Sequence, residues 1–261
     1  MIPDATLPVR VVEWNVAMSL HKKAHLLSDL EPTIAVLPES ANTERTRNAL
    51  RDIGATSIRW IGTNPNKGLL AASFGEWQLD VDASYDPGYQ WVLPLHLSGP
   101  RHLRVLAVWE MDRRGTGYPE ARQRGSVRVA LPHYADFLAG DADLSLISGD
   151  FNASVIWDKP GKLRNFGDLN RELQYRGFVS VYHHHRGWNL GAEPDPTLWW
   201  RRKEDATYHI DYTFVSRPDA IKNVVTGSFS DWIAYSDHSP TIIDLDVPCS
   251  VQGDRQCGCG R

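Results

Sequence analysis

The chain has 261 residues, of which 23% are charged, and its formal net charge is -4 at pH 7. This length is sufficient for a substantial hydrophobic core, in one large domain or in two small ones. The small negative charge excludes a global attraction to nucleic acid or to anionic membranes, so any such binding must depend on local patches.

Targeting and redox signals are weak in this sequence. No stretch approaches the roughly 20 apolar residues of a membrane helix, and the first residues lack a basic region followed by a long apolar run, which predicts no secretory signal. The three cysteines, an odd number, all lie in a Gly-rich tail over 249–261, and a nearby fourth zinc ligand is missing. They therefore predict a flexible tail without a disulfide framework, and a reducing, cytoplasmic location. No protein partner can be inferred from the sequence, so a monomer is the default expectation.

The first half of the chain alternates strand and helix signals before it turns to strands alone. Apolar runs predict strands at 9–15 and 33–37, and helical spacing predicts helices at 20–30 and 43–53. Strand-like runs with short turns between them follow at 56–61, 68–74, 77–81, 90–97 and 102–109. This cadence indicates antiparallel sheet.

The second half mixes the two types again. It predicts a helix at 122–138, interrupted near Pro132, a buried strand at 144–149 and a helix at 165–175, with strands at 178–182, 197–201, 207–215, 220–229 and 240–247. No low-complexity linker divides the chain, so one α/β (α+β) domain is expected over 1–248. Two sheets packed face to face, with helices outside, suit this order.

Polar side chains recur at the ends of these strands. They are Asn15, Glu39, Asp150 with Asn152, Asp211, and Asp237 with His238. Each has an ordinary structural explanation, such as a cap or a surface position. Together they supply oxygen ligands of the kind that Mg²⁺, Mn²⁺ or Ca²⁺ prefers, and an acid inside an apolar strand at 211 needs a partner such as a histidine.

The triple histidine His183-His184-His185 is a weaker candidate. Consecutive strand residues point to alternate faces, so the three cannot easily converge on one metal ion. An exposed strand end is the favoured reading, with a substrate contact as the alternative.

The motifs WN at 14–15, PE at 38–39, GDFN at 149–152, ID at 210–211 and SDH at 236–238, in this order, resemble those of the endonuclease/exonuclease/phosphatase superfamily. That superfamily includes abasic-site endonucleases, deoxyribonucleases, sphingomyelinases and inositol-phosphate phosphatases. The resemblance runs from about Val9 to Val247 and implies a four-layer sandwich, two β-sheets flanked by helices. It also implies hydrolysis of a phosphoester with Mg²⁺ as cofactor, and Mn²⁺ as the alternative.

The resemblance implies a role for each motif residue. Glu39 corresponds to the principal Mg²⁺ ligand, and Asn15 and Asp237 to residues that help to hold the metal. Asp150 resembles the carboxylate that orients or deprotonates the attacking water, and Asn152 the amide that contacts the phosphate. Asp211 is similar to the partner of His238, which would contact the phosphate or protonate the leaving oxygen.

Two departures separate the chain from the abasic-site enzymes. Val16-Ala17 stand where those enzymes have a second acid, and Trp109 occupies the position of a tyrosine or histidine. An indole can donate one hydrogen bond but cannot act as a base. Two segments resemble the walls of the abasic-sugar pocket or adjoin a basic run, and they contain Leu198, Trp199 and Tyr208. With Trp109, these residues are candidates for substrate binding. Core packing explains them equally well.

Two basic stretches point to the substrate. Residues 101–128 contain seven arginines, including Arg113 and Arg114, and three acids, which gives +4 locally; Arg201-Arg202-Lys203 follows Trp199-Trp200. Arginines with aromatic neighbours suit phosphate tracking and base stacking. The leading hypothesis is therefore a metal-dependent nuclease for DNA or RNA. A phosphatase or phosphodiesterase for a small molecule or lipid is the alternative, and a catalytically silent binding module is a third hypothesis.

Overall fold

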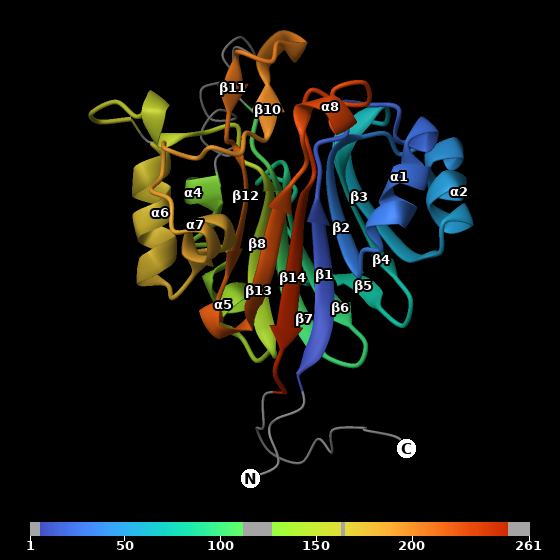
Figure 1. Ribbon diagram of the computed structural model, residues 1–261. Helices are drawn as coiled ribbons and strands as arrows, with labels where there is room; N and C mark the ends of the chain where they lie inside the picture. Colours follow the sequence, from blue (N-terminus) through green and yellow to red (C-terminus); the bar gives the residue numbers. More distant parts are fainter. Residues whose placement is uncertain (1–5, 112–126, 163–164, 250–261) are drawn as a thin grey trace.

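The computed structural model describes residues 6–111, 127–162 and 165–249. Two six-stranded mixed sheets pack against each other, and helices cover their outer faces (Figure 1). This arrangement confirms the predicted four-layer sandwich. Residues 250–261 lie outside the described ranges, so the division into a domain over 1–248 and a tail remains a prediction.

The first sheet has the order β13-β14-β1-β2-β4-β3. Its strands are β1 (Leu7–Glu13), β2 (Ile34–Ser40), β3 (Ala55–Asn64), β4 (Lys67–Phe74), β13 (Ile221–Thr226) and β14 (Thr241–Val247). The pair β1 and β2 is parallel, whereas β14 and β1 are antiparallel. The two ends of the described chain therefore lie side by side in one sheet (Figure 1).

The second sheet has the order β5-β6-β7-β8-β12-β9. Its strands are β5 (Gln78–Val81), β6 (Val92–Ser98), β7 (His102–Trp109), β8 (Leu144–Asp150), β9 (Val179–Ser180) and β12 (Asp211–Val215). A separate two-stranded ribbon, β10 (Leu198–Trp199) with β11 (Thr207–Tyr208), projects from one end of the sandwich (Figure 1).

The helices lie outside the sheets, as the sequence predicts. They are α1 (Ala24–Leu30), α2 (Glu44–Asp52), α4 (Val127–Ala130), α5 (Ala135–Ala139), α6 (Phe166–Tyr175), α7 (Val181–Arg186) and α8 (Phe229–Trp232). Short 3-10 helices are η1 (Leu20–Lys22), η2 (Val155–Trp157), η3 (Trp200–Arg202) and η4 (Pro218–Ala220). Because a strand presents alternate side chains to opposite faces, Val9 and Val11 of β1 enter the core between the sheets, while Val12 packs beneath α1 and α2.

The interruption expected near Pro132 is confirmed, because the helices α4 and α5 are separated by turns there, where proline cannot donate a helical hydrogen bond. Residues 122–126 of that expected helix lie outside the described residues. Two other sequence predictions differ from the structure. The strand at 178–182 ends at Ser180, and His183–His185 lie on α7 instead of at a strand end. The strand at 197–201 stops at Trp199, since Arg201 and Arg202 have left-handed backbone angles of 56° and 58°.

The structure bears on two further expectations, the absence of a membrane helix and the absence of a disulfide framework. Among the described residues, no helix is both long and apolar enough to cross a membrane. Cys249 is disulfide-bonded. The expectation that the cysteines form no disulfide is therefore wrong, and the inference from them to a reducing compartment loses its support.

Candidate active site

The polar residues expected at the strand ends meet at the end of the sandwich that carries β10, β11 and α8 (Figure 1). Asp150 ends β8 and stands directly opposite Asp211, the first residue of the antiparallel strand β12. Asn15 follows β1, and its side-chain nitrogen lies 2.9 Å from Asp150. Both sheets thus contribute to one buried polar cluster.

Asp150 is buried but fully engaged in hydrogen bonds. Its Oδ2 accepts from Nδ2 of Asn15 at 2.9 Å and from Nδ2 of Asn152 at 2.8 Å, while Oδ1 accepts from the backbone N–H of Asn152 at 2.8 Å. Burial, and next the negative charge of Asp211, raise the pKa of Asp150 to about 8. In the metal-free protein this carboxyl group is therefore largely protonated at neutral pH.

The backbone around Asp150 fixes the direction of its side chain. Gly149 has a φ of 148°, and a Cβ there would lie 1.9 Å from the carbonyl oxygen of Val108, so only glycine fits. Phe151 packs into an aromatic cluster beneath α6. Asn152 adopts a left-handed φ of 46°, which ends the strand geometry and folds its amide back onto Asp150.

His238 and Asp211 form a buried acid–imidazole pair. Nδ1 of His238 lies 2.9 Å from Oδ2 of Asp211. Burial alone lowers the pKa of His238, but the Asp211 carboxylate outweighs it and raises that pKa to about 10. The imidazole is accordingly protonated at neutral pH.

Neighbouring hydroxyl groups hold this pair in position. Oγ1 of Thr197 accepts hydrogen bonds from the backbone N–H groups of Ile210 and Asp211, at 3.0 and 3.1 Å. Oγ of Ser236 donates to the carbonyl of Asn15 at 2.8 Å and accepts from the His238 N–H at 3.0 Å. The histidine loop is therefore tied to the end of β1. Neither Thr197 nor Ser236 was a predicted site residue.

Glu39 lies at an irregularity in β2. The pairing of β2 with β4 shifts between Leu37 and Ser40, and Glu39 has a φ of 59°. A bulge of this kind redirects one side chain out of the sheet. Oε2 of Glu39 meets Nζ of Lys67 at 2.9 Å, and that ammonium group lies 5.3 Å from the centre of the Trp109 ring. Lys67 is a site residue that the sequence gave no reason to select.

Asp237 and a second lysine lie near Glu39. Burial, and then Arg202, lower the pKa of Lys23 to about 8, while the charges of Asp237 and Glu39 act in the opposite direction. Both acids are thus close enough to Lys23 to influence it. The Lys23 ammonium group donates to the carbonyl of Val16. Glu39 and Asp237 are both partly exposed, as metal ligands at the mouth of a site must be.

A further carboxyl group, Glu13, lies entirely inside the protein. Within the part of the chain that the structure describes, neither of its carboxyl oxygens has a hydrogen-bond partner, and the same is true of Oδ1 of Asp211. Burial, then Asp211 and Asp150, raise the pKa of Glu13 well above its usual value. Glu13 is therefore a buried acid beside Asp150 and Asp211, with its neutral form favoured over the charged one.

The donor atoms suit a hard divalent cation. Asp150, Asp211 and His238 each bring a ligand atom within 4.8 Å of the others. The Asp211–His238 hydrogen bond and the proton on that imidazole disfavour His238 as a ligand, because a metal binds neutral imidazole. The side-chain oxygens of Glu39, Asp237 and Asn15 are chemically the better match to Mg²⁺ or Mn²⁺.

The predicted substrate-binding residues differ in their exposure to solvent. Trp109, Leu198 and Trp199 are buried, and Trp109 packs edge-on against Trp91 in the core between the sheets. Because these three side chains are buried, the structure gives no support for direct contact between them and a substrate. Tyr208 is half-buried at the ribbon. Arg113 and Arg114 lie outside the described residues.

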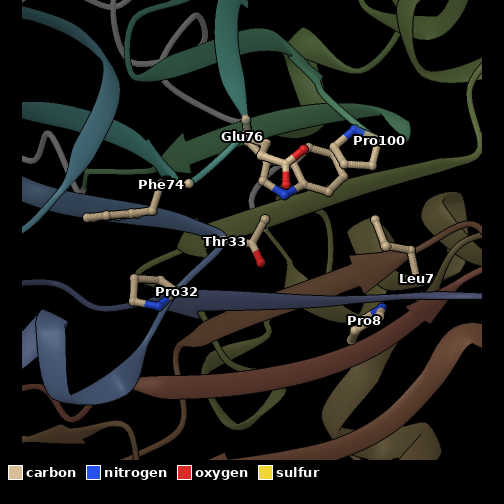
Figure 2. A pocket seen from close by; sticks show the side chains of 9 residues that line it. Leu7, Pro8, Pro32, Thr33, Phe74, Glu76 and Pro100 are labelled. Carbon is tan, nitrogen blue, oxygen red and sulfur yellow. The ribbon is translucent and has the colours of Figure 1, made fainter. Parts of the chain in front are cut away.

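A shallow pocket occurs at the opposite end of the strands (Figure 2). It is lined by Leu7 and Pro8 at the start of β1, by Pro32 and Thr33 before β2, and by residues 74–77 and Pro100. Glu76 is its only ionisable lining residue. This pocket lacks the convergent polar groups of the Asp150 cluster.

No protein-family model and no curated protein sequence matches the chain. Solved structures do. A 3' phosphatase, NExo, from Neisseria, bound to a product DNA hairpin, is similar with a TM-score of 0.70 and 19% identity, over 91% of this chain and 99% of that one. An AP endonuclease from Archaeoglobus fulgidus has a TM-score of 0.67 and 17% identity, over 92% and 100%.

A third similar structure carries the superfamily name itself. It is an endonuclease/exonuclease/phosphatase from Beutenbergia cavernae, with a TM-score of 0.60 and 16% identity, over 92% of this chain and 72% of that one. These identities are low, so the likeness establishes the fold. The chain has the fold of the endonuclease/exonuclease/phosphatase superfamily.

Proposed function

We propose that the protein is a divalent-metal-dependent phosphodiesterase that hydrolyses nucleic acid, with DNA as the first substrate to test. The observation that carries this proposal is the buried constellation of a carboxyl group, Asp150, beside a protonated imidazole, His238, 2.9 Å from Asp211. It is supported by the similar fold of a DNA-bound 3' phosphatase and of an AP endonuclease.

In-line hydrolysis needs a base on one side of the phosphorus and an acid on the other. In its ionised form, Asp150 accepts a proton from the attacking water as the water oxygen bonds to phosphorus. As the bond to the leaving oxygen breaks, His238 donates its Nε2 proton to that oxygen or stabilises its charge. Asp211 holds the imidazolium in position through Nδ1. The Asn152 amide donates both of its N–H groups, one to Asp150 and one to the Glu110 carbonyl, each at 2.8 Å. It therefore holds the Asp150 carboxyl group in position, and it contacts a phosphoryl oxygen only if one of these hydrogen bonds is exchanged for the substrate.

Glu39, Asp237 and Asn15 are the residues that would hold the metal ion. When bound, the ion stabilises negative charge on the phosphoryl oxygens. Lys67, paired with Glu39, adds a positive charge at the same edge.

The test is a panel of labelled single-stranded DNA, duplex DNA, abasic duplex and RNA, with Mg²⁺ or Mn²⁺, and with EDTA. Cleavage that requires the metal and weakens with salt supports the proposal. Absence of cleavage of every nucleic acid, by a folded protein that binds Mg²⁺, would reject it. Asp52→Asn, at an exposed position on α2, is a control for changes of charge alone.

A phosphatase or phosphodiesterase for a small molecule or lipid is the second candidate. The observation that favours it is the burial of Trp109, Leu198 and Trp199, which removes three of the expected nucleic-acid contacts. Turnover of a small phosphoester, with no cleavage of DNA or RNA, would select this function.

A further inference from the structure

Two large apolar side chains are left in solvent beside the candidate active site. Trp157 is 43% exposed and Ile156 is 55% exposed. Both lie on η2, five and four residues after Asn152. Leaving apolar surface in water costs about 25 cal/mol per Å², so an exposed aromatic residue at this place is a candidate for a contact made with a ligand.

The loop that carries Trp157 is fixed from both sides. Asp158, the next residue, accepts hydrogen bonds from the backbone N–H groups of Phe166 and Gly167 at the start of α6, at 2.7 and 2.9 Å. Val155 packs against the core below. On the other side, a Cβ added to Gly191 would lie 2.8 Å from Val155 and 3.2 Å from Ile156, so a second loop supports this one closely. The indole is therefore held at a defined position.

Tyr208 supports the indole from the ribbon. The centres of the Trp157 and Tyr208 rings lie 4.8 Å apart, with a 55° angle between their planes. Tyr208 pairs with Leu198, and Leu198 forms a β-bridge with His238. Two strand spacings of about 4.8 Å place the Tyr208 backbone roughly 10 Å from that of His238. The strand that carries Tyr208 therefore lies two strands away from His238 in the same ribbon region.

Positive charge accompanies the aromatic surface. On the same ribbon, the Arg201 guanidinium lies 5.9 Å from the centre of the Trp200 ring, which is 52% exposed. An exposed indole with a nearby cation suits a flat base attached to a phosphate backbone. An internal base of a duplex stacks on neighbours on both faces, whereas an unpaired base can offer a free face to an aromatic side chain.

We propose that Trp157, supported by Tyr208, is a stacking platform for an unpaired base next to the scissile phosphate, so that the enzyme acts on single-stranded nucleic acid in preference to duplex. This inference rests on the proposed nuclease function. It assigns to Trp157 a role in the choice of substrate, separate from the hydrolysis performed by Asp150 and His238.

The experiment measures binding and cleavage with the full chain. Binding of a fluorescently labelled single strand and of the duplex of the same sequence is measured by anisotropy, in Asp150→Asn to prevent turnover. Trp157→Ala and Trp157→Phe are made in that background. Tyr175→Ala is the matched control, since Tyr175 is an aromatic residue 93% exposed on α6. Thermal unfolding checks that each variant is folded.

Loss of one stacked base is worth about 1–3 kcal/mol, so Trp157→Ala should weaken binding of the single strand by roughly 5- to 150-fold. Duplex binding should be unchanged, Trp157→Phe should retain most affinity, and Tyr175→Ala should have no effect. Unchanged single-strand affinity in Trp157→Ala, or an equal loss with duplex, would overturn the platform. Cleavage by the wild-type protein distinguishes the failure of one proposal from the failure of the other. If the wild-type protein cuts nucleic acid but Trp157→Ala shows no selective loss of single-strand binding, only the stacking platform is wrong.

Discussion

Asp211 stands opposite Asp150 in the β8–β12 ladder and accepts a hydrogen bond of 2.9 Å from Nδ1 of His238. One imidazolium therefore lies against two carboxyl groups in a buried site. Its proton depends on these neighbours, because burial alone would remove it.

Asp211→Asn should lower the pKa of His238 from about 10, because the neutral amide no longer favours the imidazolium. The alkaline limb of the rate–pH profile should move to lower pH, and kcat should fall by about 10²–10⁴-fold if proton donation is impaired. Steady-state kinetics over a range of pH check this. A reduced rate with an unmoved alkaline limb would show that Asp211 does not act through His238.

Asp150→Ala should remove most turnover while the fold remains intact. Positioned proton transfer contributes about 10²–10⁴-fold, and the carboxyl group that is lost is buried with its pKa raised to about 8. Circular dichroism and thermal unfolding establish the fold, and single-turnover cleavage measures the loss. Near-normal turnover by the folded variant would refute the role given to this residue.

Lys67→Gln should tighten Mg²⁺ binding. The ammonium group of Lys67 occupies one oxygen of Glu39 at 2.9 Å, so a metal ligated by Glu39 must compete with it. A partly exposed ion pair is worth about 0–1 kcal/mol, which limits the gain to about fivefold. Isothermal titration with Mg²⁺ measures it, and Lys222→Gln, which breaks a surface pair with Asp246, is the control. Weaker or unchanged binding would contradict Glu39 as a ligand in competition with Lys67.

The metal-free protein should lose stability as the pH rises. The pKa of Asp150 is about 8 in the folded state and 3.8 ordinarily. Between these two pH values the folded protein keeps a proton that the unfolded chain has released. The contribution of Asp150 to the free energy of unfolding therefore falls as the pH rises from 3.8 to about 8. For His238 the contribution is complete below 6.5 and is lost as the pH passes about 10.

Thermal unfolding in EDTA, from about pH 6 to about pH 9, should therefore show a falling Tm. Glu13, whose pKa is also raised, acts in the same direction. Glu13→Gln should make the fall shallower, since an amide does not titrate. A Tm that is constant or rises over this range would contradict the raised pKa values of Asp150, His238 and Glu13.

Local sequence patterns were sufficient for most strands and for the residues that follow them. Strand periodicity and the abrupt change to Asp150 or Asn15 are visible within a few residues. The motif order then predicted the sandwich. The outcome for His183 shows the limit of such patterns. The segment expected to be a strand end forms α7 instead, and there His183 lies 2.8 Å from Ser180 and 2.9 Å from Glu193, which follows on the next loop.

The residues that were missed act through long-range contacts. Lys67 meets Glu39 only because β4 pairs with β2 across a bulge, and Thr197 supports Asp211 from a separate loop. Trp109 was considered for its position in the motif order, but its burial against Trp91 depends on the packing of the strands. No local pattern carries such information.

The most direct test of the account is cleavage of labelled single-stranded and duplex DNA by the wild-type protein, by Asp150→Ala and by His238→Ala, each with Mg²⁺ and with EDTA. The account predicts metal-dependent cleavage by the wild type, its loss in EDTA, and a fall of at least about 10²-fold in both folded variants. Equal cleavage by the wild type and by Asp150→Ala, or cleavage that survives EDTA, would contradict it.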